Sequence, residues 1–81
     1  MSAVPTIDAI DKAIWHLNAV LNGVMLRMNY YGKDAKEAAA RGSYSDAAGW
    51  QSMVLGLTTA ETLLRDEIKL LEQQRRALGQ G

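Results

Sequence analysis

The sequence predicts an all-α fold: a long antiparallel helical hairpin, with helices over about residues 6–41 and 44–78, that assembles into a four-helix bundle or a larger helical oligomer. Three observations lead to this prediction. The 81 residues include 12 alanines and one proline, a composition that favours helix over sheet. Apolar residues recur at steps of three and four along two stretches of equal length. Gly42 separates the stretches, and residues 1–81 form a single domain.

The first helix is expected to begin after Thr6, a candidate N-cap, with Asp8 and Asp11 near the positive end of the helix dipole. Its apolar stripe keeps its phase through Gly32, although glycine costs about 1 kcal/mol relative to alanine inside a helix. We therefore expect one continuous helix, with a kink or break at residues 31–33 as the alternative. The stripe consists of Ile7, Ile10, Ile14, Leu17, Leu21, Val24, Met28, Tyr31, Ala35 and Ala38.

A turn is predicted at Gly42 and Ser43. Glycine suits the position after a helix end, and Ser43 and Asp46 have the spacing of a capping box at the start of the second helix. This helix is expected to end near Leu78, before Gly79. Its apolar ladder repeats every seven residues through Trp50, Leu57, Leu64, Leu71 and Leu78, with Met53, Val54, Ala60, Leu63, Ile68 and Leu70 between the rungs.

The two ladders predict a single register for the coiled-coil pair. Facing residues should have numbers that add to about 85, and the ladders satisfy this along both helices. Each helix would be about 54 Å long at 1.5 Å per residue. The expected pairs are Ile7 with Leu78, Ile14 with Leu71, Leu21 with Leu64, Met28 with Leu57 and Ala35 with Trp50.

A second apolar strip is predicted on the outside of the first helix, which is apolar on nearly every face over residues 13–31. At about 25 cal/mol per Å² of apolar surface, leaving tryptophan, leucine and tyrosine in water forfeits several kcal/mol. We therefore expect a homodimer or higher homo-oligomer, with this outer strip as the interface between copies. The outer strip consists of Trp15, Ala19, Gly23, Leu26 and Tyr30.

Charge and polarity argue against two classes of partner. Nine basic residues balance nine acidic ones, so long-range attraction to a polyanion is lacking and nucleic acid is disfavoured. Asparagines within residues 13–31 would be costly in a bilayer, so we expect no membrane partner. The first six residues lack the basic and apolar segments of a secretion signal, which favours a cytoplasmic location.

The sequence predicts no catalytic residue, metal site or cofactor. His16 is the only histidine, and Lys12 and Val20, one turn away on either side, do not make a ligand set. The absence of cysteine excludes disulfides and thiolate chemistry. Phosphate-binding loops and nucleophile motifs are also lacking. We expect a protein that is not an enzyme.

Arg27 is the only always-charged residue of the apolar stretch 13–31, and in the predicted register it lies near Glu61. One interpretation is an Arg27–Glu61 ion pair that fixes the register. The other is a pocket between subunits in which cations neutralise an anion while aromatic rings stack on it. The candidate ligand-binding residues are Arg27, Tyr30, Tyr31, Lys33 and Trp50.

These patterns favour one functional hypothesis over another. The preferred one is a non-catalytic, homo-oligomeric helical binding protein that acts as a protein-binding adaptor or inhibitor. The alternative is a small oligomer that sequesters a nucleotide-like anionic ligand between its subunits, in the manner of small viral anti-defence proteins. The expected partners are further copies of the chain, together with a protein or a small anionic ligand.

Overall fold

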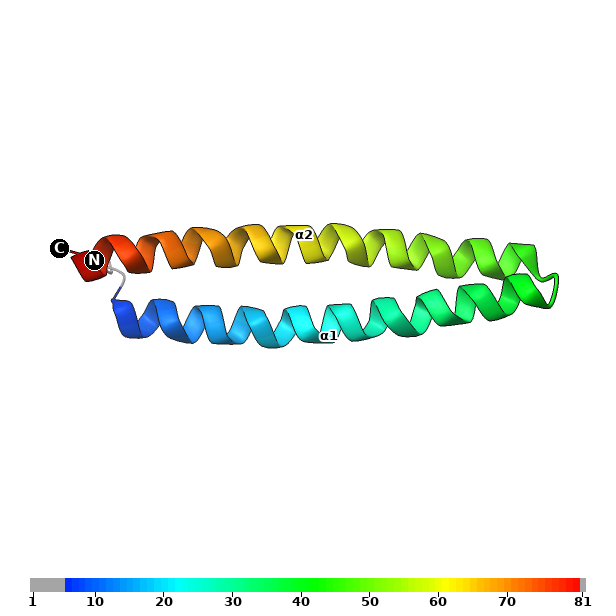
Figure 1. Ribbon diagram of the computed structural model, residues 1–81, viewed down its shortest axis with the longest axis horizontal. Helices are drawn as coiled ribbons and strands as arrows, with labels where there is room; N and C mark the ends of the chain where they lie inside the picture. Colours follow the sequence, from blue (N-terminus) through cyan, green and yellow to red (C-terminus); the bar gives the residue numbers. More distant parts are fainter. Residues whose placement is uncertain (1–5, 81) are drawn as a thin grey trace, which may run out of the picture.

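A computed structural model describes residues 6–80 of the chain and the side chains of residues 6–79. Two helices, α1 (Ile7–Ala40) and α2 (Tyr44–Gln80), lie antiparallel along their whole length (Figure 1). The molecule is a rod of 59 × 19 × 18 Å. The predicted all-α hairpin is confirmed, and each helix begins and ends within two residues of the predicted position. The expectation about a secretion signal concerns residues 1–5, which lie outside the described range.

The ends of α1 are fixed by the residues that the sequence singled out. The Thr6 hydroxyl accepts a hydrogen bond from the Ala9 amide at 3.1 Å, so Thr6 is the N-cap. At the other end the Ser43 amide donates to the Ala38 carbonyl at 2.9 Å and the Gly42 amide donates to the Ala39 carbonyl at 3.0 Å. This Schellman motif requires the left-handed φ of 80° that Gly42 adopts. The chain therefore reverses direction at the predicted turn.

Two expectations about helix ends are corrected. The Ser43 carbonyl accepts a hydrogen bond from the Ala47 amide at 3.0 Å, which is the first backbone bond of α2. Within the described residues, no side-chain hydrogen bonds of a capping box link Ser43 to Asp46. The second helix does not stop before Gly79 but includes it and continues to Gln80. By contrast, α1 runs unbroken through Gly32, as its apolar phase predicted.

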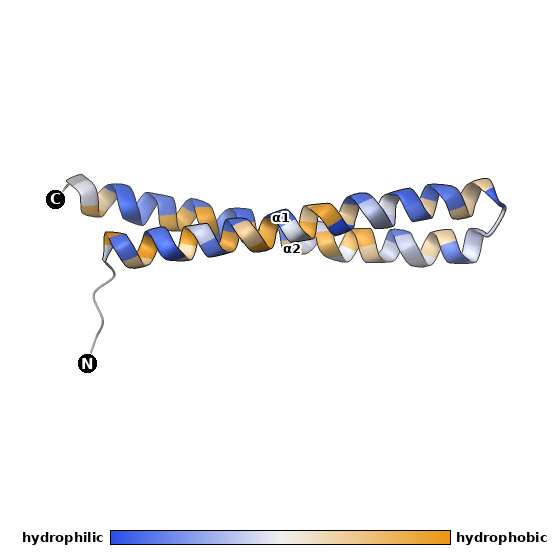
Figure 2. Ribbon diagram, turned by 90° about the horizontal axis from the view of Figure 1, so that it is seen from below, coloured by the Kyte–Doolittle hydropathy of each residue, from blue (hydrophilic) through white to orange (hydrophobic). Residues whose placement is uncertain are grey.

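The core is the seam between the two helices. The buried side chains are Ile10, Leu21, Ala35, Ala38 and Ile68, and most other members of the two ladders are half-buried. Figure 2 shows the helices crossing near their middle, where strongly apolar segments of both lie at the crossing. Ile7 and Leu78, at the open end, are exposed. Between the rungs of α2, Val54, Ala60 and Ile68 are covered, whereas Met53, Leu63 and Leu70 are exposed.

Two contacts tie the helices together. The residue numbers of Asp11 and Arg75 add to 86, close to the predicted register, whereas those of Tyr31 and Trp50 add to 81, so Trp50 contacts a residue one turn away from its expected partner Ala35. Near the turn, the rings of Tyr31 and Trp50 stack with centroids 5.3 Å apart and an interplanar angle of 23°. At the open end, the Arg75 guanidinium binds the Asp11 carboxylate through two nitrogens, one of them at 3.4 Å. The hydrogen bond that Arg75 donates to Asp11, and secondarily the charge of Asp11, raise the pKa of Arg75. Both ends of the hairpin are thus tied by side chains.

Over the residues that the structure describes, neither helix combines the length and apolarity needed to cross a membrane.

Candidate interaction surface

The outer strip of α1 faces away from the seam. Trp15 is 73% exposed, Tyr30 60% and Leu26 55%, Ala19 is also exposed, and Gly23 is half-buried. These side chains are therefore available to another molecule, as the sequence predicted. That this strip is the interface between copies stays a prediction.

A second apolar strip, which the sequence analysis did not single out as a surface, runs along α2. Leu55, Leu63 and Leu70 are each more than half exposed. Their spacing of eight and seven residues is out of phase with the inner ladder, and that phase difference was the signal in the sequence that could have revealed them. Exposed apolar side chains therefore lie on both helices.

The candidate ligand-binding residues do not converge within one chain. Tyr31 and Trp50 come together, but they stack on each other. Arg27 and Lys33 are exposed and six residues apart, which places them roughly 120° apart around α1. Tyr30 is exposed between them. One hairpin thus offers an aromatic pair that joins its helices and two cations that point in different directions.

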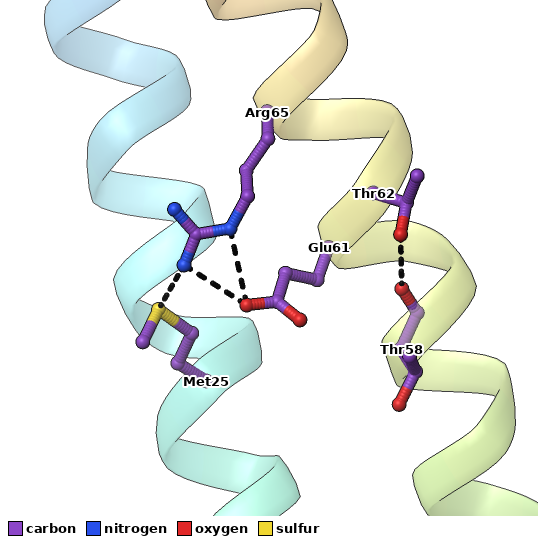
Figure 3. Close-up of polar contacts among 5 residues, drawn as sticks. All are labelled: Met25, Thr58, Glu61, Thr62 and Arg65. Atoms are coloured by element: carbon purple, nitrogen blue, oxygen red, sulfur yellow. Dashed lines mark hydrogen bonds and ion pairs between the residues drawn. The ribbon is translucent and has the colours of Figure 1, made fainter.

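The predicted Arg27–Glu61 ion pair does not form, because Glu61 binds Arg65 of its own helix. The Arg65 Nη2 and Nε atoms lie 2.9 and 3.1 Å from Glu61 Oε2, and Nη2 also lies 3.4 Å from the Met25 sulfur of α1 (Figure 3). Arg27 follows Met25 by two residues, so it points roughly 200° around the helix from it. Arg27 and Arg65 therefore lie on opposite sides of the hairpin, and the local i,i+4 pair is the one that forms.

Four hydroxyl groups in the middle of α2 are satisfied within the helix. Ser52, Thr58, Thr59 and Thr62 each donate to the carbonyl four residues earlier, at 2.9 to 3.3 Å, and Figure 3 shows the bond from Thr62 to Thr58. These hydroxyls have no unmet demand for an external partner. The surface of α2 between residues 47 and 60, which carries no charge, is therefore less polar than its composition indicates.

Depressions in the surface are shallow and open. One of about 490 Å³ lies beside Trp50 near the turn, lined also by Ser45, Asp46, Gly49 and Met53. One of about 260 Å³ lies over the middle of the seam and is lined by Asn18, Leu21, Arg65, Ile68, Lys69 and Glu72. The depression beside Trp50 contains the carboxylate of Asp46 and neither of the predicted cations, so it is poorly suited to an anion.

In the described part of the chain, no three histidine or acidic side chains lie close enough together to hold a metal ion. Two exposed acidic side chains are already paired with a basic one: Asp8 with Lys12 at 3.3 Å, and Asp11 with Arg75.

Comparison with protein-family models, with curated proteins and with solved structures gives no significant match.

Proposed function

We propose that this chain is a non-catalytic, homo-oligomeric helical binding protein that acts as an adaptor for, or an inhibitor of, a protein partner. One observation carries the proposal: the hairpin exposes more large apolar side chains than it buries. Twelve of the described large hydrophobic residues are 38 to 73% exposed, against five hydrophobic residues in the buried core. Apolar surface of this extent is typical of interaction sites.

The total surface supports the same proposal. The chain exposes 6103 Å², whereas a compact monomer of its mass would expose roughly 4,800 Å². The excess is about 1,300 Å², and a stable protein interface removes about 800 Å² from each partner. Packing against other chains is the means by which so elongated a hairpin can lower its exposed area.

Trp15 is the best candidate to anchor a protein partner. Tryptophan is enriched among residues that dominate binding energy, and Trp15, at 73% exposed, contributes little to the hairpin itself. Asn18 and Asn22, one and two turns further along α1, are also exposed and would supply a polar rim. An aromatic anchor within a polar rim suits a protein surface.

The alternative function, sequestration of a nucleotide-like anion, has less support. Tyr31 and Trp50 already stack on each other, and Arg27 and Lys33 diverge, so a pocket would need cations contributed by different subunits. Native mass spectrometry of the purified protein separates the two functions. Sequestration predicts a small molecule bound in stoichiometric amount and lost in Arg27→Ala, whereas an adaptor carries none.

A matched pair of variants tests the adaptor function directly. Trp15→Ala should weaken capture of a protein partner about 30-fold or more, because loss of an interface anchor costs about 2 kcal/mol. Lys36→Ala, an exposed residue of the same helix on neither proposed surface, should leave capture unchanged. Helicity measured by circular dichroism should be the same for both. If no captured protein depends on Trp15, the adaptor function is wrong.

A further inference from the structure

The glycines inside the helices have no role in packing the hairpin. Gly23, Gly32, Gly49, Gly56 and Gly79 are helical, and a Cβ atom added at any of them would meet nothing within 4 Å. Each glycine in a helix interior costs about 1 kcal/mol relative to alanine. The single chain therefore bears a cost at these positions that nothing within the chain explains.

Three of these glycines, Gly23, Gly49 and Gly56, lie on the same side of the hairpin. The contact between Met25 and Arg65 marks one side of the seam. At 100° per residue, Gly23 lies about 160° around α1 from Met25, and Gly49 and Gly56 lie about 160° and 180° around α2 from Arg65. The glycines thus share the side opposite that contact. We name this side the glycine face; it also carries Val20, Tyr30, Met53, Ala60, Leu63 and Leu70, each at least about 120° from Met25 or Arg65.

The opposite side, the polar face, has a different character. Within about 60° of Met25 or Arg65 lie amides, hydroxyls and charges. Its members include Asn18, Asn22, Asn29, Thr58, Thr62 and Lys69, together with the exposed ion pair of Arg65. Gly32 and Gly79 also lie on this side, about 20° from Met25 and about 40° from Arg65. The glycine face therefore carries exposed large apolar residues together with some polar and charged ones, such as His16 and Arg27, whereas the polar face carries mainly hydrogen-bonding groups.

We propose that the glycine face is occupied by a second copy of this chain, packed face to face to form a four-helix bundle. The inference rests on the proposed function, which requires a homo-oligomer, and assigns the surface that self-association uses. A side of 59 by 19 Å offers roughly 1,100 Å², enough for the 800 Å² per partner of a stable dimer. Val20, Tyr30, Met53, Leu63 and Leu70 are all 43 to 66% exposed there.

Glycine at three places on this face allows the backbones of two hairpins to approach closely. The larger side chains of one copy, such as Tyr30 and Leu63, can then pack over the glycines of the other. Charge does not oppose this arrangement. Arg27 shares this side with Asp34 and Glu67, so a second copy brings carboxylates as well as apolar surface toward the arginine, whose long stem can reach the rim.

The test compares one substitution on each face. Gly56→Glu places a charge on the glycine face, and Gly32→Glu places the same charge on the polar face, where a Cβ atom also meets open space. Both should favour helix, because glutamate has the higher helix propensity. Light scattering on a sizing column at about 50 μM should give twice the 8.9 kDa chain mass for wild type and Gly32→Glu, and one chain mass for Gly56→Glu. Gly56→Ala, a milder change, should weaken the dimer by about tenfold while the helices remain intact.

Each outcome decides a separate point. If wild type is an oligomer and Gly56→Glu keeps its mass with full helicity, the face assignment is wrong while the proposed function stands. If Gly32→Glu dissociates the oligomer and Gly56→Glu does not, the polar face is the interface and the proposal is overturned. A monomeric wild type would remove the homo-oligomer from the proposed function itself.

Discussion

The inner and outer sides of α1 carry similar apolar residues that differ in their exposure to solvent. On the inner stripe, Leu21 is 6% exposed, whereas Leu26, five residues later on the outer strip, is 55% exposed. Nothing in the chemistry of the two leucines distinguishes them, so position relative to the seam decides which one builds the fold. The difference teaches that this helix carries two apolar surfaces, one for α2 and one left for other molecules.

The largest expected effect comes from the inner stripe. Leu21→Ala should lower the free energy of unfolding by about 2 to 5 kcal/mol, because it removes buried methyl groups and leaves a cavity in the seam. Leu26→Ala, the same chemical change on the outer strip, should lower it by less than about 1 kcal/mol. Urea denaturation followed by circular dichroism measures both. Equal losses would erase the distinction between the two sides.

The two tryptophans repeat this comparison with larger side chains. Trp50→Ala should destabilise the hairpin by about 2 to 4 kcal/mol, because it removes a half-buried ring and its stack with Tyr31. Trp15→Ala should change the stability of the isolated hairpin by less than about 0.5 kcal/mol. Thermal unfolding of the two variants checks this. A stable Trp50→Ala protein would show that the stack does not join the helices.

Two glycine variants should change stability in opposite directions. Gly42→Ala forces a Cβ atom into a φ of 80° and should cost about 1 kcal/mol. Gly32→Ala, in a helical position with open space, should gain about 0.5 to 1 kcal/mol. Melting temperatures of the two variants should therefore fall on either side of wild type. A stabilising Gly42→Ala would contradict the turn geometry.

The smallest effect is expected at the open end. Asp11 and Arg75 are about half exposed, so their ion pair should be weak and screened by salt. A double-mutant cycle with Asp11→Asn and Arg75→Gln should show a coupling smaller than the change at Gly42, and 1 M salt should reduce it further. Coupling that persists at high salt would mean that the guanidinium acts through packing instead of charge.

Most of the fold could be predicted because its signals are local or periodic. Thr6 caps α1 through its hydroxyl and Gly42 ends it through a left-handed φ, and the steps of three and four from Ile10 to Ala38 select one face. Matching two ladders across one short turn predicted a register that the Asp11–Arg75 contact lies close to and the Tyr31–Trp50 stack departs from by one turn. The end of α2 was less predictable, because Gly79 terminates a helix only where its φ becomes positive, and here Gly79 is helical.

The surface was harder to predict than the core. Register places Arg27 near Glu61 along the axis, but the side of the helix on which a long side chain lies decides its partner, and Arg65 was one turn away from Glu61 on the same helix. The arrangement of Gly23, Gly49 and Gly56 was hidden for a similar reason. That these three glycines share one side becomes evident only when the Met25–Arg65 contact fixes the two sides of the seam.

We propose that the seam folds the chain, whereas the glycine face joins it to a second copy. Sedimentation equilibrium over about 1 to 200 μM, with helicity measured on the same samples, tests this proposal most directly. We expect a mass of at least two chains that falls toward one chain on dilution. A single-chain mass at every concentration, with full helicity, would contradict the proposal.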